Sequence, residues 1–116
     1  MTSMEQQQRV VCARFGVAYY PAPDDLMLGL SKSVVEGAQP VNGLRHPPEG
    51  HTTGWYIWAG EEEISTDPET FEAIHVEHLH DICPTVLPYL GLPPGWRFLI
   101  AEGYEDVWED PVLLNV

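Results

Sequence analysis

Two short segments, residues 53–59 and 96–101, are apolar on both faces of an extended backbone, and they constrain the fold of this chain most. The first reads Thr-Gly-Trp-Tyr-Ile-Trp-Ala and the second Trp-Arg-Phe-Leu-Ile-Ala. Aromatic and β-branched residues favour strands, and strands that are apolar on both faces are typical of sheet interiors. We therefore predict that both are central strands of one sheet. Four of their side chains are expected to be buried: Trp55, Ile57, Phe98 and Ile100.

Capping residues, glycines and prolines predict the other elements. Residues 4–15 are typical of a helix with Ser3 as its N-cap and Gly16 after its end. A short helix is expected to begin at Pro84 and to be broken, or 3₁₀ in part, at Pro88. The remaining segments are expected as strands at 26–30 and 71–76, helical turns at 31–36 and 77–82, and a surface loop or weak hairpin at 39–54.

Strands and helices alternate here without the regular rhythm of a doubly wound fold. This order predicts an α+β protein with a mixed or antiparallel sheet and a few short helices on one side. A length of 116 residues is typical of one domain, so we expect residues 1–116 to form a single small domain.

The chain is strongly acidic. It has 18 aspartate and glutamate residues against five lysine and arginine residues, for a formal net charge of −13. Such a charge repels nucleic-acid phosphates and anionic membrane surfaces, whereas it attracts basic proteins. We therefore expect no binding to nucleic acid or to membranes.

The N-terminal residues and the cysteines indicate a cytoplasmic protein. Residues 1–8 lack the basic and apolar regions of a secretory signal, and no apolar run approaches the roughly 20 residues of a membrane span. Cys12 and Cys83 do not make a disulfide framework, so both thiols are expected to be reduced.

The strongest candidates for a metal or catalytic site are His75, His78 and His80, which lie close to Glu77 and Asp81. A helix would bring His75 and His78 to one face, and a strand would bring His78 and His80 to one face. No single regular element presents all three together, and the spacing is not that of the His-Glu-x-x-His zinc motif. We therefore expect no metal ion, no cofactor and no catalytic residue.

Three further features have a structural and a functional interpretation. The adjacent carboxylates at 61–63 suit either a divalent cation or, more commonly, a solvated docking surface. Cys12 or Cys83 would be a nucleophile only beside a histidine, and an inert buried cysteine is the more common case. Arg97 lies between two aromatic residues, so we expect it to pair with an acid or to stack on a ring.

Acidic residues concentrate in two runs that have few neighbouring cations. No lysine or arginine occurs from His46 to Trp96, a stretch that contains the acids at 61–63, and a second acidic run follows at 102–110. Because few internal cations neutralise these groups, a basic partner protein could form ion pairs with them. We expect the chain to act by binding another protein and not as an enzyme.

The contacts to that partner are expected in the two acidic runs and at exposed aromatic residues near them, because large aromatic side chains supply much interface energy. The expected partner-binding residues are Glu61, Glu62, Glu63, Asp67, Glu69, Glu102, Tyr104, Glu105, Asp106 and Trp108.

A series of short motifs occurs in order along the chain. The more specific are Gly-Trp-Tyr-Ile-Trp-Ala-Gly-Glu at 54–61 and Pro-x-x-x-Pro-Tyr-Leu at 84–90, and others lie at 31–37, 75–79 and 92–98. Together they resemble the Imm33 immunity-protein family of bacterial polymorphic-toxin systems, formerly a domain of unknown function. The strand at 55–58 reads Trp-Tyr-Ile-Trp where the family more commonly has Trp-Arg-Phe-Phe, which indicates a divergent member.

The resemblance covers about residues 28–114 and leaves residues 1–25 as an N-terminal helix and loop extension. It implies a non-enzymatic immunity protein, or antitoxin, that binds a cognate bacterial toxin domain and neutralises it by occlusion. We expect that toxin domain to be basic. The toxin's own activity and the oligomeric state of this chain stay open at this point.

Two alternative functions stay open as well. One is a small metal-binding protein or enzyme that uses His75, His78 and His80, which stoichiometric zinc in the purified protein would favour. The other is a ligand-binding accessory domain that has no toxin partner. A neighbouring gene for a large toxin with a matching C-terminal domain would favour the immunity function.

Overall fold

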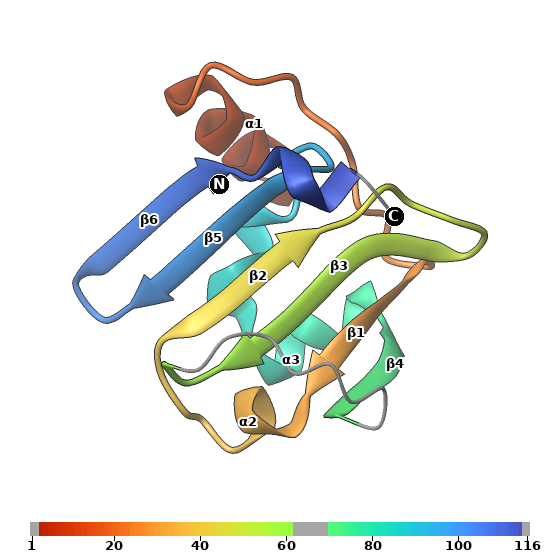
Figure 1. The fold of residues 1–116 in the computed structure, drawn as a ribbon, viewed down its shortest axis with the longest axis vertical. Helices are drawn as coiled ribbons and strands as arrows, with labels where there is room; N and C mark the ends of the chain where they lie inside the picture. The colour runs from red at the N-terminus through yellow and green to blue at the C-terminus, as the bar shows by residue number, and fades with distance from the viewer. Residues whose placement is uncertain (1–2, 62–69, 115–116) are drawn as a thin grey trace.

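The computed structural model describes residues 3–61 and 70–114, and the strands in these ranges form one six-stranded sheet (Figure 1). Their order across the sheet is β4–β1–β3–β2–β5–β6, with β1 and β3 parallel and all other neighbours antiparallel. The strands are β1 (Met27–Ser31), β2 (Val41–Arg45), β3 (Thr52–Ala59), β4 (Phe71–His75), β5 (Trp96–Ala101) and β6 (Tyr104–Glu109). This mixed sheet confirms the predicted α+β class.

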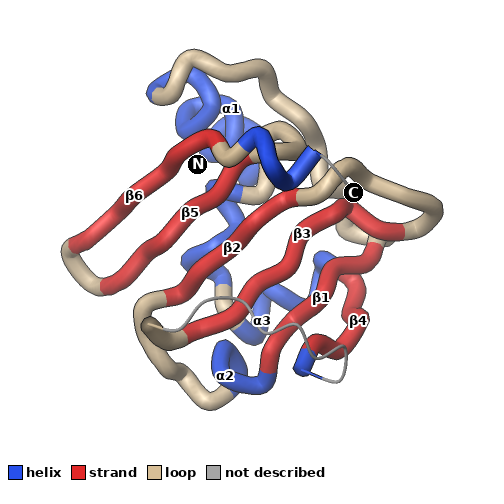
Figure 2. The backbone as a smooth tube through the Cα atoms, viewed as in Figure 1, coloured by secondary structure: helices blue, strands red, loops and turns tan. Residues whose placement is uncertain are grey.

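The helices are short, and most of them lie on one side of the sheet (Figure 2). They are α1 (Met4–Arg14), α2 (Lys32–Val35), η2 (Val76–His78), α3 (Leu79–Ile82), η3 (Pro84–Tyr89) and η4 (Pro111–Leu114), where η marks a 3₁₀ helix. In Figures 1 and 2, α1 and α3 lie behind the sheet, whereas η4 lies in front of it. The sheet face turned away from α1 and α3 therefore lacks an α-helical layer in the described part of the chain, and we call it the open face.

The first helix begins where the sequence predicts. The Ser3 side chain accepts a hydrogen bond from the Gln6 backbone N–H, and the Gln6 side chain accepts one from the Ser3 N–H. This reciprocal capping box satisfies two backbone donors that a helix start otherwise leaves without a partner. Val11 and Cys12 are buried in the main hydrophobic core and α1 packs on η3, so α1 is part of the core.

The prediction of a surface loop or weak hairpin at 39–54 misses that the first part of this segment is an interior strand. Residues 41–45 form β2, an interior strand between β3 and β5, and all five are buried. Gly43 has no side chain and Arg45 is charged, so the segment lacks the apolar pattern of a buried strand. Both residues suit this position, because the Phe98 ring fills the space above Gly43 and Arg45 is bound by backbone carbonyls.

The late apolar residues Val107 and Trp108 belong to a second strand that the sequence did not predict. β6 forms a hairpin with β5 in continuous register, with Ala101 opposite Tyr104. Gly103 in the turn has φ of 75°, a conformation that glycine adopts readily. The hairpin places the second acidic run at one edge of the sheet.

The two strands predicted as central are both interior strands, and β2 lies between them. Their four expected core side chains are buried, with Ile57 and Phe98 fully inaccessible. The rings of Trp55 and Phe98 pack at a centroid distance of 5.5 Å. The prediction for this part of the fold is confirmed.

Arg45 joins three distant parts of the chain from inside the protein. It is 1% exposed, and its guanidinium lies 4.7 Å from the Tyr20 ring centroid and 5.5 Å from that of Trp55. It donates hydrogen bonds of 2.8–3.1 Å to the backbone carbonyls of Thr53, Tyr20, Pro21, Leu90 and Leu92. Burial lowers its pKa to about 10, so the side chain still carries its charge at neutral pH. The carbonyl dipoles supply the stabilisation that a carboxylate would otherwise give.

None of the helices in residues 3–61 and 70–114 has the length and apolarity that crossing a membrane would require.

Candidate protein-binding surface

The first acidic run lies only partly in the described chain. Glu61 follows β3 and is exposed, as is Glu72 on β4. The other predicted binding residues of this run lie outside the described residues: Glu62, Glu63, Asp67 and Glu69.

The β5–β6 hairpin carries the second run and divides it between the two faces of the sheet. The register pairs Leu99 with Asp106 and Arg97 with Trp108. Because successive strand residues point to opposite faces, Asp106, Trp108 and Tyr104 share the open face with Leu99 and Arg97. Glu102 lies in the turn and is exposed.

Glu105 lies on the opposite face and is bound within the protein. Both Arg14 of α1 and Tyr89 of η3 donate hydrogen bonds to its carboxylate. The bond from Arg14 lowers the pKa of Glu105, and the bond from Tyr89 acts in the same direction. Burial, and then the hydrogen bond to Glu105, raise the pKa of Tyr89 to about 12. Glu105 thus links β6 to α1 and η3.

Arg97 is held on the open face between two indole rings. Its guanidinium carbon is 6.0 Å from the Trp58 ring centroid and 5.2 Å from that of Trp108, and its Nη1 is 3.3 Å from Asp110 Oδ2. Both expected roles, pairing with an acid and stacking on a ring, are confirmed. The stack holds Trp108 on the surface in a half-buried position.

A second aromatic group lies on the open face near β1 and β4. The Tyr56 ring lies over Gly29, where a Cβ would come within 2.8 Å of Tyr56 Cδ1. Phe71 and His46 each meet the Tyr56 ring edge-on, at centroid distances of 5.4 and 5.6 Å. Glycine at position 29 therefore makes room for an aromatic row across the sheet.

The open face has its own small apolar cluster, which η4 covers in part. Leu113 of η4 packs with Leu44 and Trp58. The next residue, Leu114, is 48% exposed. Tyr104 is 56% exposed and Tyr56 is 37% exposed. Exposed aromatic and aliphatic side chains on one face are typical of protein contact surfaces.

The histidines predicted as the strongest metal or catalytic candidates do not converge. His75 and His78 lie with ring centroids 6.1 Å apart, whereas His80 faces Asp24, with 3.6 Å between Nε2 and Oδ1. Within residues 3–61 and 70–114, no three side chains of histidine, cysteine, aspartate or glutamate come close enough to hold a metal ion.

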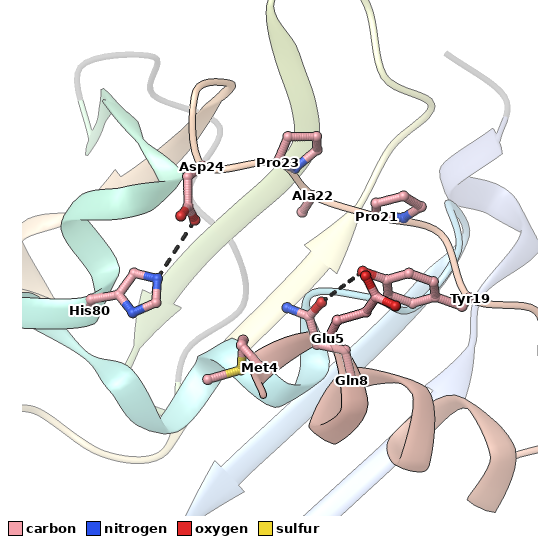
Figure 3. A pocket seen from close by; sticks show the side chains of 9 residues that line it. All are labelled: Met4, Glu5, Gln8, Tyr19, Pro21, Ala22, Pro23, Asp24 and His80. Atoms are coloured by element: carbon pink, nitrogen blue, oxygen red, sulfur yellow. Dashed lines mark hydrogen bonds and ion pairs between the residues drawn. The ribbon is translucent and has the colours of Figure 1, made fainter. Parts of the chain in front are cut away.

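The pair formed by His80 and Asp24 borders a shallow pocket of about 230 Å³ between α1, α3 and the segment that precedes β1 (Figure 3). Its other polar side chains also have partners, because Tyr19 Oη donates to Gln8 Oε1 at 3.2 Å and Glu5 is paired with Arg9. Pro21, Pro23 and Met4 supply apolar lining. The arrangement has neither a nucleophile–base pair nor a ligand set in its lining.

The two cysteines lie in different settings. Cys12 is buried, its Sγ is 3.2 Å from the Gly91 carbonyl oxygen to which it donates, and burial raises the pKa of its thiol. Cys83 is half-buried, with its Sγ 3.4 Å from Thr85 Oγ1. A buried thiol with a raised pKa is a poor nucleophile, since the thiolate is the reactive form.

These features define a small α+β protein that presents aromatic and acidic groups on an open sheet face. The family model of the Imm33-like domain matches residues 7–110. The chain therefore belongs to the Imm33-like family, as the resemblance at 28–114 indicates. The match also reaches into α1, which the resemblance left outside. No curated protein and no solved structure matches the chain.

Proposed function

We propose that the chain is an immunity protein that binds a cognate bacterial toxin domain and neutralises it by occlusion. The observation that carries this proposal is the match to the Imm33-like family over nearly the whole chain. In this function the protein works by covering the toxin and performs no catalysis. It acts in the cytoplasm, where a cell needs protection from its own toxin.

The charge of the chain supports a basic partner. A net charge of −13 speeds the approach of a basic surface and disfavours acidic competitors. Toxin domains that act on nucleic acids need a basic surface to approach phosphates, so carboxylates on an inhibitor can occupy the same surface. The proposed binding residues remain those of the two acidic runs, except that the carboxylate of Glu105 is already bound by Arg14 and Tyr89.

Co-expression with the toxin domain encoded by the adjacent upstream gene tests the proposal. We expect a stoichiometric complex on size-exclusion chromatography and rescue of growth in cells that make the toxin domain. An unrelated toxin domain of similar charge is the control and should neither bind nor be neutralised. Full toxicity in the presence of this chain, together with the absence of a complex, would reject the immunity function.

Metal analysis of the same purified protein tests the alternative function. Stoichiometric zinc that also raises the melting temperature would favour a metal protein that uses His75, His78 and His80. We expect well under one zinc per chain, because His80 lies apart from the other two and faces Asp24.

A further inference from the structure

The β5–β6 half of the open face combines exposed apolar surface with acidic side chains. Leu99, Tyr104, Asp106 and Trp108 lie here on two adjacent strands, and we call these four residues the hairpin patch. Tyr104 is 56% exposed, Asp106 is exposed, and Leu99 and Trp108 are half-buried. No described α-helix covers these strands on this side, whereas α1 and η3 pack behind them (Figure 1).

The central aromatic residue of the hairpin patch is positioned before any partner binds. Arg97 stacks on Trp108, and Asp110 fixes the Arg97 guanidinium. β6 itself is held in register by β5 along its whole length. A rigid aromatic side chain loses little conformational entropy on binding, so it is well suited to anchor an interface.

Charge makes this half of the open face suitable for a cationic partner. Arg9 and Arg14 both lie on α1, and Arg45 is buried. At the described strand positions of the open face, Arg97 is the single lysine or arginine, and its charge is matched by Asp110. The carboxylate of Asp106 and that of Glu102 in the turn therefore leave this half of the face negative. A cationic partner would meet attraction here, whereas the two arginines of α1 are each balanced by an acid, Glu5 or Glu105.

We propose that the hairpin patch is the surface on which the toxin domain docks, with lysine or arginine side chains of the toxin around an apolar contact to Tyr104 and Trp108. This inference rests on the proposed immunity function and adds its location. It also separates the residues of β6: those on the open face contact the partner, whereas Glu105 on the other face holds the fold together. The pocket beside α1 is not the docking surface, since its polar side chains already have partners within the protein.

Four single variants test the location. Tyr104→Ala and Asp106→Lys alter the hairpin patch, and both side chains are exposed, so the fold should survive. Ile82→Ala and Asp81→Lys on α3 are the matched controls, because they make comparable changes at exposed positions behind the sheet. Asp81→Lys and Asp106→Lys change the net charge equally, so any difference between them reports position.

Binding to the toxin domain of the adjacent gene is measured by surface plasmon resonance, after thermal unfolding has shown that each variant is folded. We expect Tyr104→Ala to raise Kd about tenfold or more and Asp106→Lys to slow association roughly tenfold. The α3 controls should stay within about twofold of wild type. If the wild type binds, and the α3 substitutions weaken binding whereas the hairpin substitutions do not, the proposed location is wrong and the immunity function stands. If the wild-type chain neither binds nor neutralises this toxin domain, the immunity function fails, and the location fails with it.

Discussion

The ring of Phe98 lies directly against the backbone of Gly43 on the neighbouring strand, where a Cβ would overlap the ring atoms. The glycine is thus the reason that a full aromatic ring fits between β2 and the helices. Gly43→Ala should reduce the free energy of unfolding by about 1–3 kcal/mol, the usual cost of overpacking a core. Urea denaturation followed by circular dichroism measures this loss.

A double-mutant cycle identifies the ring as the cause. Phe98→Leu removes Cε2 and Cζ, the two ring atoms nearest to the new methyl group, although it costs stability by itself. If the clash is responsible, the loss from Gly43→Ala should be smaller in the Phe98→Leu background than in the wild type. Strictly additive losses would instead point to an effect of alanine on the strand itself.

Arg45 is predicted to be the most sensitive charged residue in the chain. Arg45→Met fills similar space but removes a donor from five backbone carbonyls, of which, within the described residues, only that of Leu90 has a second side-chain donor, the Trp55 indole N–H. Each unsatisfied buried polar group costs about 1–3 kcal/mol, so the variant should lose at least about 3 kcal/mol or fail to fold. Arg45→Lys should also be destabilised, because a single ammonium cannot reach carbonyls on several sides.

The matched control is Lys32→Met, which removes a cation at an exposed position of α2. It should change the free energy of unfolding by no more than about 0.5 kcal/mol. Thermal and urea unfolding of the three variants compares them directly. Equal stability of Arg45→Met and Lys32→Met would contradict the structural role of the buried guanidinium.

The hydrogen bonds to Glu105 should make part of the stability depend on acid pH. Because its pKa in the folded state is below the ordinary value of 4.5, the unfolded chain takes up the proton first as the pH falls. The stabilisation is therefore complete above pH 4.5 and is lost as the pH falls through the folded-state pKa. Glu105→Gln should remove this part of the pH dependence, measured as the urea midpoint between pH 7 and pH 3.

Arg14→Met provides an independent check, since it removes the main donor to Glu105 and keeps the carboxylate. It should also flatten the acid limb of the stability profile. An acid limb that is unchanged in both variants would assign the pH dependence to other carboxylates.

The sequence predicts the interior strands β3 and β5 and most short helices because their signals are local. Apolar residues on both faces identify β3 and β5, and Ser3, Gly16 and Pro84 mark helix ends. β2 is not predicted as an interior strand, because the burial of its residues depends on contacts with residues far along the chain. Gly43 is explained by Phe98, and Arg45 by carbonyls at positions up to 47 residues away.

The candidate surface is predictable only in its composition. The acids and aromatics of residues 102–108 are visible in the sequence, but their faces depend on the register of the β5–β6 hairpin. A one-residue shift would exchange the faces of Glu105 and Asp106, and local sequence does not set that register. The contact of Arg14 with Glu105 is equally hidden, because α1 and β6 are 91 residues apart at that point.

Removing the Trp108 ring should affect how long a complex lasts. Trp108→Ala should increase the dissociation rate roughly 30-fold or more, with a much smaller effect on association, because the loss of a buried aromatic anchor acts after docking. Trp108→Phe keeps a ring over Arg97 and should fall between alanine and wild type. Surface plasmon resonance gives both rates. A slower association with an unchanged dissociation rate would show that Trp108 does not anchor the partner.

The acids at 61–63 are predicted to act at an earlier stage, during approach. Replacing all three with lysine changes the net charge by six, so a basic toxin domain should associate more slowly. The logarithm of the association rate should also fall less steeply with ionic strength, because salt then has less attraction to screen. Stopped-flow measurements from about 20 to 500 mM salt determine both effects, and Glu61→Gln, Glu62→Gln and Glu63→Gln together should give half the change in charge and an intermediate slope. If the association rate of the wild type does not depend on salt, and the three lysine substitutions do not lower it, this acidic run has no part in binding. The hairpin patch would then be the remaining proposed binding surface.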